Sequence, residues 1–312
     1  MRNYKFAAFV MTYERSNLIL DTIEKLKSQV FPPELILIID NSQSNLSKDL
    51  ILGKDYQDVI YHQMGYNSGP AGAASYGLKE LVRLGYDWIY WGDDDNPPRD
   101  ENVFKDLFSG IEELLNDNVR LGIIGEKGGK FNSITGRIRS LSNPELKSKK
   151  FIEVDSIPGG HSMIVNSEVI KDGILPDAEL FFGFEEFDFC LKAKRKDYKL
   201  IIDAAKWYKI RVIADKGQTY QWRHSNLGED NLLIREYYST RNLLKIFYTH
   251  QLYIPFLILL LKSFGKMIYG FRFGTRYGMK MLHFQKLALR DLLKNNFGEL
   301  INDSNNRIQL KK

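Results

Sequence analysis

Residues 88–98 read Trp-Ile-Tyr-Trp-Gly-Asp-Asp-Asp-Asn-Pro-Pro, an apolar run followed at once by three aspartates and two prolines. The run predicts a buried strand, and the acidic cluster would lie where that strand ends. Carboxylate oxygens suit hard cations such as Mg²⁺ and Mn²⁺, which commonly bridge a protein carboxylate to a diphosphate. Three adjacent carboxylates repel one another without a cation. The stretch therefore predicts a divalent-metal site, with an exposed acidic turn as the alternative.

The residues before this stretch alternate between predicted strands and helices. Strands are expected at 4–12, 34–39, 59–63 and 87–91, and helices at 17–29 and 72–84. Short apolar strands that alternate with amphipathic helices favour a doubly wound, mostly parallel α/β sheet. Ligands of such sheets bind beyond the carboxyl ends of the strands.

Polar groups follow all four predicted strands, so they are expected to converge at one edge of the sheet. They are Thr12-Tyr13-Glu14-Arg15, Asp40-Asn41-Ser42, Asn67-Ser68-Gly69 and Asp93-Asp94-Asp95. Asp40 would accept hydrogen bonds from a base or ribose, or else act as a turn residue. Arg15 would reach a phosphate, or else be a surface arginine. The small residues of loop 65–74 would let a ligand approach free backbone N–H groups where a helix begins.

In this order the motifs resemble those of family 2 glycosyltransferases of the GT-A fold. The Asp-Asp-Asp-x-x-Pro run is similar to that of the rhamnosyltransferase and galactofuranosyltransferase branches. The resemblance covers residues 4–245 and implies a catalytic domain at 1–245. It implies a donor-nucleotide site formed by Thr12, Tyr13, Arg15, Asp40, Asn67, Gly69 and Asp94. It also implies that Asp93 and Asp95 form an Asp-x-Asp motif for Mn²⁺ or Mg²⁺, with Asp95 as the direct ligand.

A second acidic group is surrounded by phenylalanines, because residues 180–191 read Leu-Phe-Phe-Gly-Phe-Glu-Glu-Phe-Asp-Phe-Cys-Leu. Burial raises the pKa of a carboxylate and makes it a better base toward a sugar hydroxyl. The stretch resembles the acidic-pair motif that opens a helix in the family. This implies Glu186 as catalytic base, with Glu185 and Asp188 in hydrogen-bonding or orienting roles. Relatives usually have Asp at the base position, so the choice between Glu185 and Glu186 stays open. Acids that cap a helix are the structural alternative.

The second half of the chain offers three further candidates. His161 follows Pro158-Gly159-Gly160 and either faces the substrates or is a buried structural histidine. The resemblance implies that His224 completes the metal site. It also implies a diphosphate contact for Arg241, in Tyr237-Tyr238-x-x-Arg241-Asn242, where the guanidinium would neutralise the leaving group. A structural ion pair is the alternative for Arg241.

Positive charge is concentrated near the C-terminus. Residues 262–312 hold 11 Lys and Arg against 3 Asp and Glu, a net of +8, whereas the whole chain is +5, which leaves about −3 for residues 1–261. The apolar run 252–261 is too short to cross a bilayer. Aromatic and basic residues then alternate over 262–276, which suits a helix on an anionic membrane surface. We therefore expect 246–312 to be a helical appendage that binds membrane, with a buried hairpin or an oligomer interface as the alternatives. No nucleic-acid-binding module accompanies these basic residues.

Together these features predict an inverting, metal-dependent glycosyltransferase. It would move a sugar from a nucleotide-diphosphate donor to a hydroxyl of a glycan or polyprenyl-linked acceptor in cell-surface polysaccharide synthesis. A nucleotidyltransferase that makes nucleotide sugars would need a Lys- and Gly-rich phosphate loop, which residues 10–18 lack. A non-catalytic sugar-nucleotide-binding module would not need the Glu185–Glu186 pair. The single cysteine, Cys190, fits a reducing compartment, so we expect a cytoplasmic enzyme, peripheral on the inner face of the cell membrane.

Overall fold

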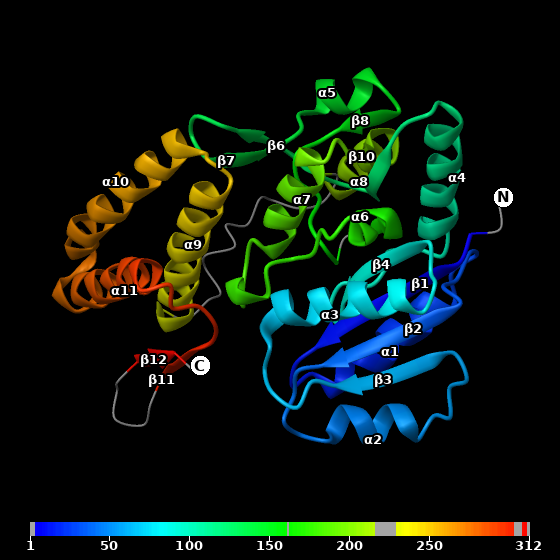
Figure 1. Cartoon of the computed structure of the whole chain (residues 1–312), viewed down its shortest axis with the longest axis horizontal. Helices are drawn as coiled ribbons and strands as arrows, with labels where there is room; N and C mark the ends of the chain where they lie inside the picture. The colour runs from blue at the N-terminus through cyan, green and yellow to red at the C-terminus, as the bar shows by residue number, and fades with distance from the viewer. Residues whose placement is uncertain (1–3, 161, 216–228, 303–307, 311–312) are drawn as a thin grey trace. The chain divides into compact units, whose positions relative to one another are not determined.

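The computed structural model places the strands and helices of the first hundred residues close to their predicted positions (Figure 1). It describes residues 4–160, 162–215, 229–302 and 308–310. The first elements are β1 (Phe6–Thr12), α1 (Ser16–Lys27), β2 (Leu35–Asp40), α2 (Leu46–Leu52), β3 (Val59–Gln63), α3 (Gly69–Arg83) and β4 (Trp88–Asp93). The predicted alternation of strand and helix is confirmed.

These strands form one half of an eight-stranded sheet with the order β3-β2-β1-β4-β9-β5-β10-β8. The later elements around it are α4 (Val103–Asn116), β5 (Leu121–Gly125), α5 (Asn143–Ser148), β8 (Phe151–Glu153), β9 (Met163–Asn166), α6 (Ser167–Lys171), α7 (Glu185–Arg195), β10 (Lys199–Asp203) and α8 (Ala204–Asp215). Strand β9 is antiparallel to β4 and β5, and β8 is antiparallel to β10, whereas the other pairs are parallel. The predicted fold class, α/β with a mostly parallel sheet, is confirmed.

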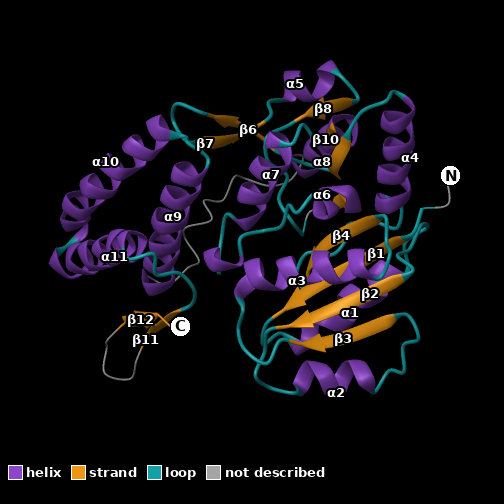
Figure 2. Cartoon of the chain, in the orientation of Figure 1, coloured by secondary structure: helices purple, strands orange, loops and turns teal. Residues whose placement is uncertain are grey.

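The sheet has an apolar cluster on each face. Phe9 of β1 packs in one cluster with Leu78 of α3, while the next residue, Val10, belongs to the other with Ile19 of α1 and Phe108 of α4. Figure 2 shows helices along the strands of this sheet. Because both faces are covered, the strands read as continuous apolar runs rather than as alternating ones.

The chain divides into two compact units, and the sheet belongs to unit 1 (residues 1–130, 140–178 and 185–210). Unit 2 comprises residues 131–139, 179–184 and 211–312. Its elements include most of the hairpin β6 (Gly129–Asn132) and β7 (Arg137–Ser140), part of the turn η1 (Ala178–Leu180), then α9 (Glu229–Thr249), α10 (Tyr253–Tyr269), η3 (Gly270–Phe273), α11 (Thr275–Leu293), β11 (Leu300–Asn302) and β12 (Ile308–Leu310).

The predicted C-terminal helical region is present, but its start differs from the predicted boundary at residue 245. That boundary would cut through α9. Tyr237 and Tyr238 of α9 pack with Met281 and Phe284 of α11 in one apolar cluster. Tyr237 and Tyr238 precede residue 245 in sequence, so the predicted boundary would separate them from the helix they pack against. The whole of α9 belongs to unit 2.

Helix α10 extends beyond the apolar run 252–261 seen in the sequence. The described residues contain one helical stretch, Tyr253–Phe273, that is long and apolar enough to cross a membrane by length and composition alone, with a mean hydropathy of 1.5. This corrects the expectation that the segment is too short, which counted only the continuous run 252–261. The helix continues past Lys262 and Lys266 because two isolated lysines do not interrupt helical hydrogen bonding.

Candidate functional site

Neighbouring strands of the sheet end level with one another. In the parallel register Thr12 pairs with Asp40, Asp40 with Gln63, and Met11 with Asp93. The polar groups that follow β1, β2 and β4 therefore lie along one edge of the sheet, as predicted. The local contacts decide which of these groups face solvent and which are committed to the protein.

Asp94 is a buried anchor for the turn after β1. Its Oδ2 atom accepts a hydrogen bond from Thr12 Oγ1 at 2.6 Å, and its Oδ1 atom accepts one from Arg15 Nη1 at 3.2 Å. Its main-chain oxygen accepts from the Thr22 hydroxyl at 2.7 Å. Arg15 Nη1 also contacts the exposed carboxylate of Asp95. The side chains of Thr12 and Asp94 thus have partners within the protein, and Arg15 lies beside the acidic cluster.

Asp40 is fully buried at the end of β2. Its Oδ1 atom accepts from the Ser42 N–H at 2.7 Å, which is the Asx-turn contact weighed as the structural alternative. Its Oδ2 atom accepts from the hydroxyl of Tyr61 on β3 at 2.8 Å. Burial and this hydrogen bond raise the pKa of Tyr61. Sequence reasoning missed Tyr61, although its place near the end of β3 was a signal.

The loop before α3 is held to the end of β2 by one side chain. Asn41 Oδ1 accepts from the Ser68 N–H at 3.1 Å and from its hydroxyl at 2.7 Å, while Asn41 Nδ2 donates to the Gly69 carbonyl at 3.2 Å. Asn67 Oδ1 accepts from the Gly69 N–H at 3.1 Å. Asn67 and Gly69 therefore build the turn itself. Tyr13 is 49% exposed, and among the predicted nucleotide contacts it and Arg15 present the most side-chain surface.

The loop that contains Gly159 and Gly160 brings two predicted site residues together. Gly160 donates to the Trp91 carbonyl at 3.1 Å, and a Cβ built on Gly160 would lie 2.4 Å from Asp93 Oδ2. The N–H of Gly159 donates to the carboxylate of Glu186. Asp93 at the end of β4 and Glu186 in the first turn of α7 are therefore charge neighbours in unit 1.

Electrostatics in this group follow from burial and from like charges. Burial raises the pKa of Asp93 to about 7, with further contributions from the Glu186, Asp95 and Asp94 carboxylates that outweigh the opposing effect of Arg15. Burial also raises the pKa of Glu186, against the lowering effect of two backbone N–H groups. A carboxylate with a raised pKa is suited to accept a proton from a hydroxyl.

The residues Asp93 and Asp95 fit a hard divalent cation. Their oxygens are the preferred ligands of Mg²⁺ and Mn²⁺, and a cation would relieve the repulsion that raises the pKa of Asp93. Within the described residues no group of three or more His, Cys, Asp and Glu side chains is arranged to hold a metal ion. A two-carboxylate set suits ions that retain waters and bind substrate phosphates. The predicted ligand His224 and the candidate His161 lie outside the described residues.

The other acids of α7 have different surroundings from Glu186. Asp188 is buried and pairs with Lys192 Nζ at 2.6 Å, one turn further along the same helix. Glu185 is also buried, with 4% exposure. Of the three acids in the first turn, Glu186 is the one that raises the pKa of Asp93. Cys190 on this helix is fully buried.

Arg241 does not have the surroundings of a phosphate ligand. Its side chain is fully buried in unit 2. The guanidinium donates to the Asn242 side chain, the Tyr237 hydroxyl and the main-chain oxygens of Leu180 and Gly298 at 3.0–3.3 Å. It also lies 5.0–5.1 Å from the ring centroids of Tyr237, Tyr238 and Phe297. In this structure the guanidinium therefore contacts carbonyls, a hydroxyl, an amide and aromatic rings, and these partners match neither the implied phosphate contact nor the alternative ion pair with an acid.

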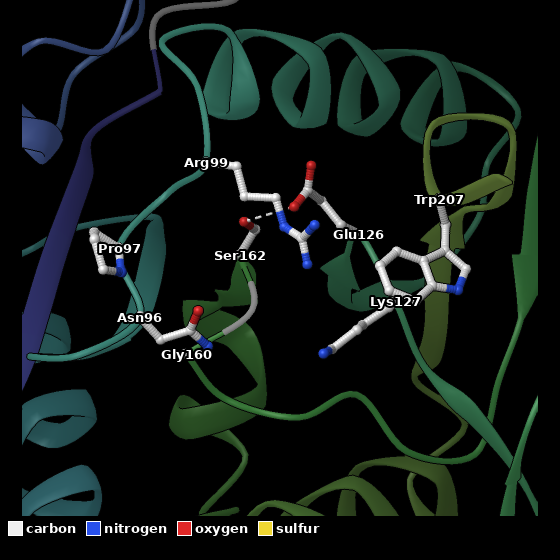
Figure 3. Close-up of a pocket in the computed structure, with 8 residues that line it drawn as sticks. All are labelled: Asn96, Pro97, Arg99, Glu126, Lys127, Gly160, Ser162 and Trp207. Carbon is white, nitrogen blue, oxygen red and sulfur yellow. Dashed lines mark hydrogen bonds between the residues drawn. The ribbon is translucent and has the colours of Figure 1, made fainter. Parts of the chain in front are cut away.

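A small pocket lies beside Gly160 on unit 1 (Figure 3). It is lined by Asn96, Pro97, Arg99, Glu126, Lys127, Gly160, Ser162 and Trp207. Ser162 Oγ donates to Glu126 Oε2 at 3.1 Å, and Lys206 Nζ lies 3.3 Å from Glu126 Oε1. The cationic groups of Arg99 and Lys127 lie 5.7 and 5.5 Å from the Trp207 ring centroid. Sequence reasoning missed Glu126, which follows β5 directly and would have been found by the strand-end rule.

Comparison with known proteins agrees with this arrangement. A profile described as glycosyl transferase family 2 matches residues 8–173, which include most of β1, the elements from there to β9, and the acidic cluster. The chain belongs to this family. The resemblance noted from the sequence motifs is therefore confirmed.

Two curated relatives within the family are galactofuranosyltransferases. The chain is 26% identical over 196 residues to galactofuranosyltransferase GlfT1 of Mycolicibacterium smegmatis, and 26% identical over 199 residues to its namesake in Mycobacterium tuberculosis. In both cases the match covers 58% of this chain and 62% of the relative. The chain therefore spans about three fifths of the length of the relatives it matches.

Solved glycosyltransferases have the same fold. The mannosyltransferase PcManGT from Pyrobaculum calidifontis, in complex with GDP-Man and Mn²⁺, gives a TM-score of 0.53 at 9% identity and covers 94% of this chain and 88% of its own. GalNAc-T7 with UDP, GalNAc and Mn²⁺ gives 0.54 at 13% identity, over 80% and 55%. S. aureus TarS 1–349 in complex with UDP-GlcNAc gives 0.51 at 14% identity, over 98% and 96%. These matches support the GT-A assignment.

Proposed function

We propose that this family 2 glycosyltransferase moves a sugar from a nucleotide-diphosphate donor to an acceptor hydroxyl, with inversion and with Mn²⁺ or Mg²⁺ as cofactor. The observation that supports it best is the meeting of Asp93 and Glu186 at the Gly159-Gly160 loop. One carboxylate comes from the acidic cluster at a strand end, and the other opens a helix in the second half of unit 1. A metal-ligand candidate and a base candidate are thus adjacent.

In the proposed mechanism Glu186 is the base. As the acceptor oxygen forms a bond to the anomeric carbon, its proton passes to the Glu186 carboxylate. The bond from the anomeric carbon to the diphosphate oxygen breaks on the opposite face, and the diphosphate leaves with the electron pair. A single base on one face of the sugar gives inversion. The raised pKa of Glu186 favours this proton transfer near neutral pH.

The negative charge on the leaving diphosphate would be neutralised by cationic groups at the acidic cluster. Asp93 and Asp95 would hold the divalent ion, which when bound neutralises charge on the diphosphate. Arg15 would exchange its contact with Asp95 for a phosphate oxygen, since its guanidinium is half exposed. Tyr13 would lie against the nucleoside. Thr12, Asp40, Asn67, Gly69 and Asp94 would shape that surface through the contacts described above.

The relatives suggest which donors to test first. The curated relatives are named as galactofuranosyltransferases, and the solved neighbours were crystallised with UDP, UDP-GlcNAc or GDP-Man. We propose a glycan or polyprenyl-linked acceptor in cell-surface polysaccharide synthesis. The first screen would combine UDP-galactofuranose, dTDP-rhamnose, UDP-GlcNAc and GDP-mannose with Mn²⁺, and read thermal stabilisation of the protein.

We further propose that α10 lies on an anionic membrane surface. One side of the helix is fixed within unit 2, because the Ser263 hydroxyl donates to Gln285 of α11 at 2.6 Å and Lys266 pairs with Glu236 of α9. The other side bears an outer stripe of exposed apolar residues at helical spacing. The outer stripe consists of Ile254, Leu257, Leu261, Phe264 and Ile268 of α10 and Phe271 of the adjoining η3, each 42–77% exposed.

The net charge of the segment that follows in sequence complements an anionic bilayer. Residues 262–290 contain seven Lys and Arg and no acid. A helix with one side bonded to its neighbours and the other apolar suits an in-plane position better than a span. The cytoplasmic leaflet of a cell membrane carries the anionic lipids, so we propose a cytoplasmic enzyme at that surface.

Replacement of the base tests the proposed function. Glu186→Gln keeps the side-chain shape but cannot accept the proton, so turnover should fall by roughly 10²–10⁴-fold while UDP affinity in Mn²⁺ barely changes. Glu185→Gln is the matched control, because that acid is buried in the same turn. Loss of turnover in Glu185→Gln alone would move the base to that residue. Full turnover in both variants, or in excess EDTA, would contradict the proposed mechanism.

A further inference from the structure

We infer that Asn242, oriented by Arg241, is a positioning residue that holds the strained turn from which the catalytic helix α7 begins. This inference rests on the proposed role of the acids at the start of α7. The turn comprises residues 180–184 and is followed directly by Glu185 and Glu186. Residues 179–184 belong to unit 2, whereas residue 185 begins the last segment of unit 1.

A single side-chain amide fixes three carbonyl groups of the turn. Asn242 Nδ2 donates to the main-chain oxygens of Leu180 at 2.9 Å, Phe182 at 3.0 Å and Gly183 at 3.1 Å. Asn242 is fully buried, so its hydrogen bonds do not compete with solvent. The Leu180 oxygen also accepts from the Phe182 N–H at 2.7 Å, so the amide adds to a backbone hydrogen bond there and supplies a partner to the Phe182 and Gly183 oxygens.

Arg241 orients that amide. Its Nε atom donates to Asn242 Oδ1 at 3.0 Å, which directs the amide nitrogen toward the turn. Its Nη2 atom donates to the same Leu180 oxygen at 3.1 Å. The aromatic rings around its guanidinium fix the arginine in turn. The buried arginine thus has a use that does not require a substrate phosphate.

The turn needs this support because its backbone is strained. Phe181 and Phe184 have φ values of +61° and +72°, and Gly183 lies between them in sequence at +84°. Bulky residues rarely adopt positive φ, and such conformations persist only where the surroundings enforce them. Strain of this kind is concentrated at functional sites. Here it occurs one to four residues before the acids that open α7.

Residues of α9 before and after Asn242 also contact the segment that contains the turn. The ring of Tyr238 stacks on Phe181 at 5.7 Å between centroids and meets the Phe182 ring at 5.6 Å. One turn beyond Asn242, Lys245 pairs with Glu179. Positions 238, 241, 242 and 245 share one side of a helix, so α9 holds the turn along its length.

For the reaction, the consequence is that the backbone conformation just before α7 is fixed. Glu186 follows Gly183 by three residues, so we expect freedom in the turn to become freedom in the first turn of α7, which carries this carboxylate. A displacement of about 1 Å at a reacting group can reduce turnover about 10²-fold without weakening substrate binding. The predicted signature of the Asn242 clamp is therefore a fall in kcat at constant nucleotide affinity.

Asn242→Ala removes the amide nitrogen that makes all three contacts with the turn, and Thr240→Val is its matched control. Thr240 lies on another side of α9 and donates to Gln285 at 3.1 Å, so its loss costs a buried hydrogen bond without touching the turn. We expect Asn242→Ala to lower kcat about 10- to 100-fold with the best donor of the panel, while the Kd of UDP in Mn²⁺ and the donor KM stay within twofold. Thr240→Val should keep wild-type kcat.

A second variant perturbs the turn without entering the buried cluster. Gly183→Ala places a side chain at φ +84° in open space, and Gly85→Ala does the same at φ +87° in a turn away from the site. Gly183→Ala should lower kcat and Gly85→Ala should not. Hydrogen exchange of the metal-free protein supplies a readout without substrate: backbone amides of residues 180–187 should exchange at least tenfold faster in Asn242→Ala than in wild type or Thr240→Val.

Three results would overturn the clamp: wild-type kcat in both Asn242→Ala and Gly183→Ala, unchanged exchange at 180–187, or equal losses of kcat and UDP affinity in Asn242→Ala and Thr240→Val. Failure of the proposed function looks different. In that case no donor in the panel is turned over, or Glu185→Gln and Glu186→Gln both remain active. The exchange experiment would then still decide whether Asn242 holds the turn.

Discussion

Asp93 Oδ2 lies so close to Gly160 that any side chain at position 160 would meet it, since a Cβ there would be 2.4 Å away. Gly160 also has φ +66°, a conformation that favours glycine. The two residues come from β4 and from the loop before β9. Their contact sets the position of the first carboxylate of the acidic cluster.

Gly160→Ala should therefore displace Asp93 and weaken Mn²⁺ binding more than tenfold, with a parallel loss of turnover. Gly173→Ala is the matched control, because Gly173 has φ +78° with no atom near its Cβ position. Both variants pay the cost of a positive φ, about 1–3 kcal/mol. Mn²⁺ titration by electron paramagnetic resonance separates them. Equal Mn²⁺ affinities in the two variants would mean that Asp93 does not bind the ion.

The raised pKa of Asp93 predicts a pH-dependent cost to stability in the metal-free protein. The folded state holds the proton of Asp93 up to about pH 7, whereas an unfolded aspartate loses it near its ordinary value of 3.8. Stability from this group therefore rises as the pH falls from about 7 toward 4, and is lowest above 7. Asn cannot ionise, so Asp93→Asn should remove the cost.

Thermal denaturation in EDTA measures this effect. At pH 8 the Asp93→Asn variant should melt about 2–4 °C above wild type, and the difference should shrink toward pH 4. Asp117→Asn, at an exposed position after α4, should show no such gain. A lower melting temperature for Asp93→Asn at pH 8 would contradict the raised pKa. The variant should also lose Mn²⁺ binding, so the stabilised protein would be inactive.

Arg15 is predicted to compete with the metal ion for Asp95. Because the Arg15–Asp95 pair is exposed and worth up to about 1 kcal/mol, Arg15→Gln should tighten Mn²⁺ binding in the absence of nucleotide by about three- to fivefold. The same variant should weaken UDP binding in Mn²⁺, because a phosphate contact is lost. Arg83→Gln, which breaks a surface pair with Glu80 on α3, is the control. Tighter UDP binding in Arg15→Gln would remove Arg15 from the proposed phosphate site.

The strands were predictable because local apolar runs determine them, and the family motifs placed their polar ends. The charge interaction between Asp93 and Glu186 was not visible in the pattern, because both residues adjoin a loop from a third part of the chain. Arg241 is the opposite case, in which the local sequence suggested a site contact and the structure shows buried packing. Its sequence surroundings resemble a family element near the diphosphate, yet Tyr237, Tyr238 and Phe297 enclose it in unit 2. Such packing joins residues far apart in sequence, and no local periodicity reports it.

The outer stripe of α10 predicts binding to vesicles that contain anionic lipid. Insertion of an exposed Leu or Ile side chain into the bilayer surface contributes roughly 1.5–3 kcal/mol, and each nearby basic residue about 1 kcal/mol. Leu261 and Ile268 are 70% and 77% exposed, so the double change to Glu should reduce vesicle affinity at least tenfold without disturbing the fold.

Leu293→Glu is the control, because Leu293 is 86% exposed but lies at the end of α11. Co-sedimentation should show wild type and Leu293→Glu bound at low salt and partly released in 0.5 M NaCl, where charge screening is stronger. If wild type instead ignores the vesicles and forms a dimer that Leu261→Glu/Ile268→Glu dissociates in light scattering, the outer stripe is an oligomer interface.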